Sequence, residues 1–150
     1  MKESGVTDGS HNYCNASFNS LLCFEVAAQM SKSKQKGTLA ETAVADYLRQ
    51  TFPAVERRAL SGINDKGDVA GVPDCVIEVK NQRSYKIHEW IKETEIERIN
   101  AEVGLGILVI KPNGVGVANV SQWWAVVSLE TITKLIKDLQ SAERLRASRD

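Results

Sequence analysis

Two acidic residues lie on either side of a predicted β-hairpin. Asp68 precedes the turn at residues 71–74, and Glu78 follows it. If the hairpin is centred near Pro73, Asp68 lies directly opposite Glu78, with Cβ atoms about 4.5–5.5 Å apart. Two like charges repel at that distance, and a divalent cation between them removes the conflict. Because Mg²⁺ is typically held by one or two carboxylates with water and substrate phosphate, the pair predicts a magnesium site.

A lysine follows the second acid at the spacing that shares its side of a strand. Alternation along an extended chain places Glu78, Lys80 and Gln82 on one face, whereas Ile77 and Val79 point the other way. An ammonium beside a metal-bound carboxylate can steady an attacking water or a phosphate oxygen. A metal ion also lowers the pKa of bound water toward neutrality. This combination of residue types predicts hydrolysis of a phosphodiester.

These residues resemble a known enzyme family. Asp68 followed by Glu78-Val79-Lys80 is similar to the signature of the PD-(D/E)XK, or restriction-endonuclease-like, nuclease superfamily. The segment Lys36-Gly37-Thr38-Leu39-Ala40-Glu41 resembles the Lys-Gly-x-x-x-Glu start of the Holliday-junction resolvases in that superfamily, and the Ser61-Gly62 loop is similar to theirs. The resemblance covers about residues 32–127.

The resemblance implies a role for each matched residue. Asp68 and Glu78 bind Mg²⁺, for which Mn²⁺ can substitute, and the backbone carbonyl of Val79 is a further ligand. Lys80 is the catalytic lysine, and Glu41 is the first-helix acid that can support a second ion or its waters. The resemblance also implies a homodimer that acts on branched or duplex DNA.

The Pro73-Asp74 pair matches the name of the superfamily, but its place in the chain argues against a metal ligand. Asp74 is four residues before Glu78, which on one extended strand is about 13 Å. The two carboxylates could not share an ion at that separation. The metal-binding acid is therefore assigned to Asp68.

Each of the central residues also has a purely structural interpretation. Thr38 and Glu41 have the spacing of a capping box at a helix start. Asp68 after Gly67 can be a turn residue, and Lys80 can guard the edge of a sheet against aggregation.

Further polar residues are candidates for contact with DNA phosphates, because lysine, arginine, serine and glutamine side chains make most such contacts. The candidate DNA-binding residues are Lys36, Arg57, Arg58, Ser61, Lys66, Gln82 and Arg83.

Apolar periodicity and turn residues predict the elements that carry these side chains. The order α-β-β-β-α-β-β-α indicates an α/β fold with a mixed sheet flanked by helices, and the resemblance implies the restriction-endonuclease-like version. Ser128 is the expected N-cap of the last helix, and the apolar residues of the second predicted helix are Ile87, Trp90, Ile91, Ile96 and Ile99. The predicted helices are 38–50, 84–103 and one from residue 129; the predicted strands are 54–60, 68–70, 75–80, 105–111 and one or two within 115–127.

Composition limits the class of protein. The 150 residues are 43% hydrophobic and 25% charged, without an apolar run long enough for a membrane helix. Three widely spaced cysteines favour a reducing, cytoplasmic setting. Residues 1–29 are expected to be a disordered extension or an upstream region read through from an alternative start, and residues 30–150 a single nuclease domain.

The net charge of zero hides an uneven distribution. Residues 1–30 sum to −2, residues 31–92 to +3 and residues 93–150 to −1. The middle segment holds Glu41, Asp68 and Glu78, whose charges a cation would partly neutralise. Overall neutrality therefore does not exclude a nuclease, but it predicts salt-dependent DNA binding of modest strength.

These observations favour a Mg²⁺-dependent DNA endonuclease, in particular a Holliday-junction resolvase of DNA recombination. The alternative within the enzyme class is another nuclease of the same fold that acts on flaps, duplex ends or foreign DNA. The alternative outside it is a catalytically silent DNA-binding or assembly module.

Overall fold

A computed structural model describes the backbone of residues 16–58 and 66–149 and the side chains from Lys32 onward within those ranges. The chain divides into two compact units, Met1–Gln35 and Lys36–Asp150. Helix α1 (Ala16–Arg49) contains the boundary between them. All the candidate site residues belong to the second unit.

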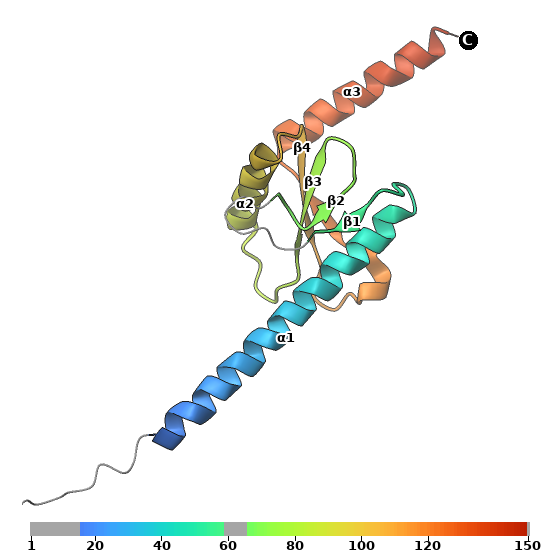
Figure 1. The fold of residues 1–150 in the computed structure, drawn as a ribbon. Helices are drawn as coiled ribbons and strands as arrows, with labels where there is room; N and C mark the ends of the chain where they lie inside the picture. The colour runs from blue at the N-terminus through green and yellow to red at the C-terminus, as the bar shows by residue number, and fades with distance from the viewer. Residues whose placement is uncertain (1–15, 59–65, 150) are drawn as a thin grey trace, which may run out of the picture. The chain divides into compact units, whose positions relative to one another are not determined.

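The second unit is an α/β structure built on a five-stranded mixed sheet with the order β1-β2-β3-β4-β5 (Figure 1). Only the β3/β4 pair is parallel, and helix α2 connects these two strands. The α-helices and strands follow the predicted order along the chain, but residues Val117–Gln122, within the segment 115–127 predicted to supply strands, form a 3-10 helix. The strands are β1 (Glu56–Arg57), β2 (Val69–Ala70), β3 (Cys75–Lys80), β4 (Leu105–Ile110) and β5 (Trp124–Val126); the remaining helices are α2 (Ile87–Asn100), the 3-10 helix η2 (Val117–Gln122) and α3 (Leu129–Ala147).

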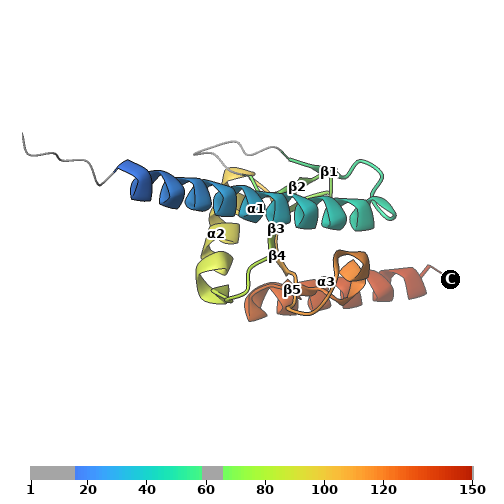
Figure 2. The same cartoon turned by 90° about the horizontal axis from the view of Figure 1, so that it is seen from below.

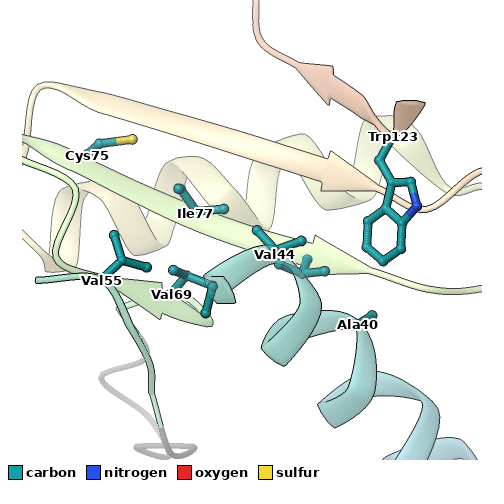
Figure 3. Packing of buried hydrophobic residues seen from close by; sticks show 9 residues of the cluster. Ala40, Val44, Val55, Val69, Cys75, Ile77 and Trp123 are labelled. Carbon is teal, nitrogen blue, oxygen red and sulfur yellow. The ribbon is translucent and has the colours of Figure 1, made fainter. Parts of the chain in front are cut away.

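The two faces of the sheet are covered by different helices (Figure 2). Ala40 and Val44 of α1 pack against Ile77 of β3 and Val69 of β2, as Figure 3 shows. On the opposite face, Trp90 of α2 forms a smaller apolar cluster. Its partners there are Leu108 and Ile110 of β4. Strand β3 thus lies in the middle of the sheet with a helix on each side.

Helix α1 differs from the expected helix at its start. It begins at Ala16, so Thr38 lies in its interior, where the Thr38 carbonyl accepts a hydrogen bond from the Thr42 hydroxyl. The capping-box interpretation of Thr38 and Glu41 is therefore wrong. Residues 1–15 lie outside the described residues, and the interpretation of residues 1–29 as an extension stays a prediction.

Helix α2 buries only part of its apolar set. Trp90, Thr94 and Glu97 are its buried residues, whereas Ile96 and Ile99 are exposed. Two of the three buried residues of α2 are therefore polar. The Thr94 hydroxyl donates to the Trp90 carbonyl over 2.8 Å.

Helix α3 begins as predicted, because the Ser128 hydroxyl accepts a hydrogen bond from the Thr131 amide over 3.0 Å. No described residue of α3 is buried, however, and its leucines and isoleucines are exposed. Among the described residues, no helix combines the length and apolar character needed to cross a membrane.

Candidate active site

The β2–β3 hairpin has the predicted register. Val69 pairs with Ile77, and the Asp68 amide donates to the Ile77 carbonyl over 2.9 Å, which brings Asp68 beside Glu78. Gly67 makes this approach possible. It has φ of +80°, and a Cβ at that position would lie 2.5 Å from the Val76 side chain. Only glycine fits there, so the chain can turn sharply just before the first acid.

The Asp68 carboxylate accepts a hydrogen bond from β3 that a backbone carbonyl of a neighbouring strand would normally accept. Beyond the short β2 strand, its Oδ2 accepts a hydrogen bond from the amide of Val79 over 2.8 Å. Burial raises the pKa of Asp68 to about 8, with the neighbouring charges of Glu78 and Glu41 acting in the same direction and the Val79 amide opposing them. Asp68 therefore lies next to the turn at Gly67 and accepts a structural hydrogen bond. It is also an acid that the negative charges of Glu78 and Glu41 repel.

Glu78 is the most buried acid of the site and has a cationic partner. Its Oε1 lies 2.6 Å from the Nζ atom of Lys80, which also lies 2.9 Å from Oε2 of Glu93. Burial raises the pKa of Glu78 to about 7; Lys80 opposes this, and Glu97 contributes to it. Burial alone would lower the pKa of Lys80, but the two carboxylates outweigh burial and hold it above its ordinary value, so the lysine stays charged.

Lys80 does not guard a sheet edge. Strand β3 has neighbours on both sides, and Lys80 itself is paired in register with Ile110 of β4. The edge interpretation of this lysine is therefore wrong.

Glu41 of α1 also contributes to this cluster. Its charge acts on Asp68, and its Oε2 lies 3.0 Å from the Nη1 atom of Arg57 on β1. Of the four residues predicted to act together, Asp68 contacts Glu78, Lys80 pairs with Glu78, and Glu41 on α1 acts on Asp68 through its charge.

Two acids of α2 belong to the same cluster and were missed from the sequence. Glu93 binds Lys80, and Glu97 is buried beside Glu78, with which it shares a hydrogen bond. The two are four residues apart and therefore lie on one side of a helix. That spacing, on a helix connecting β3 to its parallel neighbour, is the signal that could have identified them.

The donor chemistry of the cluster fits a hard divalent cation. Asp68 and Glu78 supply carboxylate oxygens that repel each other, and Mg²⁺ commonly binds proteins through only one or two carboxylates. Within residues 32–58 and 66–149, no three His, Cys, Asp or Glu side chains converge into a fuller metal cage. Two carboxylates completed by water are therefore the donor set that these residues offer, and the Val79 carbonyl as a further ligand stays a prediction.

The Asp74 carboxylate has a different role, as the sequence spacing predicted. Its Oδ1 accepts a hydrogen bond from the Gly104 amide over 2.6 Å, and its backbone carbonyl accepts one from Leu105 over 3.1 Å. Asp74 thus anchors the start of β4 to the hairpin turn.

The predicted DNA-binding residues lie in two groups. Lys36, Gln82 and Arg83 line one cleft beyond the end of β3. Arg57 is paired with Glu41, and the Arg58 guanidinium donates to the carbonyl of Lys66, whose side chain is exposed. Ser61 lies outside the described residues.

Comparison with protein-family models, with curated proteins and with solved structures gives no match for this chain.

Proposed function

We propose that this protein is a Mg²⁺-dependent DNA endonuclease of the restriction-endonuclease-like type. The observation that carries the proposal is the contact between the half-buried Asp68 and the buried Glu78, with the Lys80 ammonium 2.6 Å from Glu78. Burying two neighbouring carboxylates costs stability unless a cation compensates their charge. The resemblance in motif and element order adds a resolvase acting on four-way DNA junctions as the proposed member of that class.

Each residue has a defined role in this proposal. Asp68, Glu78 and the Val79 carbonyl would hold the ion, which when bound supplies positive charge at the phosphate and acidifies water. Lys80 remains protonated and can donate a hydrogen bond to the attacking water or to a phosphate oxygen as negative charge develops. Glu41 is close enough to influence Asp68, and it can orient water on the α1 side.

The two partners of Lys80 prepare it for this role. Glu78 and Glu93 hold the ammonium between β3 and α2 before substrate arrives. A side chain held in this way loses little further conformational freedom on binding a phosphate, so more of the interaction contributes to the reaction.

The test compares cleavage of a four-way junction, a flap and a linear duplex in Mg²⁺ by the wild type and by Lys80→Ala. We expect the variant to lose at least about a hundredfold in cleavage rate, because one charge-stabilising donor is removed. Lys86→Ala is the matched control, since Lys86 makes a surface ion pair with Glu89 on the same helical region and should leave the rate unchanged.

Lys80→Ala also removes the partner of a buried acid, so its folding is checked by circular dichroism. Asp68→Asn keeps an acceptor for the Val79 amide and provides a second inactive variant with less disturbance. Paired symmetrical nicks in the junction alone support a resolvase, whereas cleavage of all three substrates supports another nuclease of this type. Full cleavage by folded Lys80→Ala, or none by the wild type, would overturn the proposal.

A further inference from the structure

The cleft lined by Lys36, Gln82 and Arg83 lies just beyond the carboxyl end of β3. It has a volume of about 400 Å³ and is bounded by α1, by the segment that follows β3 and by the turn that follows β4. Its polar lining residues are Lys36, Asn81, Gln82, Arg83, Lys111 and Asn113. Three of these residues, Asn81, Lys111 and Asn113, were not among the predicted DNA contacts.

Hydrogen bonds hold the walls of this cleft together. The Asn81 side chain donates to the Lys36 carbonyl over 3.2 Å, which joins the end of β3 to α1. The Asn113 side chain donates to the Arg83 carbonyl over 3.0 Å, which joins the two loops. The amide of Lys111 donates to the carbonyl of Lys80 over 2.9 Å, which joins the residue after β4 to the last residue of β3.

The charge of the cleft is positive and uncompensated. Lys36, Arg83 and Lys111 line it without any acidic residue among its described lining. In the described part of the chain these three side chains make no ion pair, whereas the half-buried Lys80 and Arg98 are each paired with an acid. Amide groups beside them add further hydrogen-bond donors. This lining is suited to an anion with several oxygen acceptors.

The cleft also has an apolar rim. Leu39 of α1 and Val117 of η2 line it and are 61% and 46% exposed. A free phosphate ion would leave these side chains in contact with water. A nucleic-acid strand presents phosphate oxygens together with the apolar surface of sugars and bases, and so it matches both parts of the lining.

We propose that this cleft binds the phosphate backbone of the DNA strand that is being cut, close to the Asp68–Glu78 site. This inference rests on the proposed nuclease function. The cleft residue Gln82 is two residues beyond Lys80, which is at most about 7 Å of chain. A duplex strand carries one phosphate per about 3.4 Å of its axis, so neighbouring phosphates are spaced on the same scale. A DNA strand bound in the cleft is held in position for cleavage at the Asp68–Glu78 site.

The test measures DNA binding without cleavage. Fluorescence anisotropy of a labelled junction and duplex, in EDTA and over a range of NaCl concentrations, compares the wild type with Lys111→Gln and Arg83→Gln. Both substitutions keep the backbone hydrogen bonds of the walls. We expect each to weaken binding several-fold and to reduce the slope of log affinity against log salt by about 0.9 per lost phosphate contact. Lys137→Gln, an exposed lysine of α3, is the matched control and should change neither quantity.

Unchanged affinity and slope in both cleft variants would overturn the inference, as would an equal loss in Lys137→Gln. Tighter binding of a matched RNA, sensitive to Lys111→Gln while DNA binding is not, would also overturn it. These outcomes are separate from the test of the nuclease proposal. Binding in EDTA requires neither metal nor cleavage, whereas the Lys80→Ala comparison depends on both.

Discussion

Glu78 and Val79 are neighbours on β3 and are each only 7% exposed, but they face opposite layers of the protein. Val79 joins the apolar cluster under α1, whereas Glu78 faces α2 with Lys80 and Glu97. Burying a valine contributes about 1.5–3 kcal/mol to folding. Burying a carboxylate beside another acid opposes folding unless its charge is compensated. The apolar residues on the α1 face therefore stabilise the sheet, whereas the buried acids on the α2 face oppose folding.

The difference shows how the fold can tolerate a crowded acidic site. The buried acids are few, and apolar clusters pack on both sides of the sheet. Trp90 of α2, together with Leu108 and Ile110 of β4, fills the rest of the α2 face. The unfavourable burial of these acids is offset by the favourable burial of the apolar residues around them. Such local conflict within a stable frame is typical of functional sites.

The largest expected effect on stability comes from the α1 face. Ile77→Ala removes a side chain that is 3% exposed and packed between α1 and the sheet. We expect the free energy of unfolding to fall by about 2–5 kcal/mol, because the lost burial is accompanied by a cavity. Urea denaturation followed by circular dichroism measures this change.

Ile96→Ala on α2 is the matched control for this prediction. Ile96 is 58% exposed, so the same chemical deletion should change the free energy of unfolding by no more than about 0.5 kcal/mol. Similar losses in the two variants would contradict the assignment of the main core to the α1 face.

A smaller effect of opposite sign is expected on the α2 face. Asp68→Asn removes one of two neighbouring buried acids, and the amide oxygen can still accept from the Val79 backbone. In EDTA, we expect the free energy of unfolding to rise by about 1 kcal/mol, in the range that relief of such conflicts commonly gives. Thermal unfolding with and without Mg²⁺ completes the test, because a ligand that binds only the folded state raises the melting temperature.

Wild-type protein should therefore gain thermal stability in Mg²⁺, and Asp68→Asn should gain much less. Asp138→Asn, an exposed acid of α3, should behave as the wild type in both conditions. A destabilised Asp68→Asn would show that this acid does not oppose folding, and a variant that keeps the full Mg²⁺ effect would show that Asp68 does not hold the ion.

Strand β3 and its hairpin were predictable because local signals specify them. An apolar run bounded by turn residues predicted Cys75–Lys80 with the observed bounds, and the turn around Pro73 predicted the register that pairs Val69 with Ile77. Alternation then determines which side chains share a face. These inferences need only the chain within a few residues of each position.

The surroundings of Glu78 were not predictable in this way. Glu97 on α2 is buried although acids usually remain exposed, whereas Ile96 and Ile99 of the same helix are exposed. The burial of Glu97 depends on Lys80 and Glu78, which belong to a different element. The start of α1 was missed for a related reason, since Gly37 and Thr38 resemble a helix start but lie within a longer helix.

The smallest expected effect is a chemical one, on the α1 face. Cys75 is buried there, and burial together with the charge of Asp74 raises the pKa of its thiol to about 11. At pH 8 only about one such thiol in a thousand is ionised, and the thiolate is the reactive form. We expect iodoacetamide to leave Cys75 unmodified in the folded protein and to modify it in urea, as peptide mass mapping would show. Asp74→Asn should increase native labelling slightly, because one of the two causes of the raised pKa is removed while the bond from Gly104 can persist. Rapid native labelling would mean that this face of the sheet opens more readily than the α1 packing implies, and it would weaken the contrast between the stabilising and the charged side of β3.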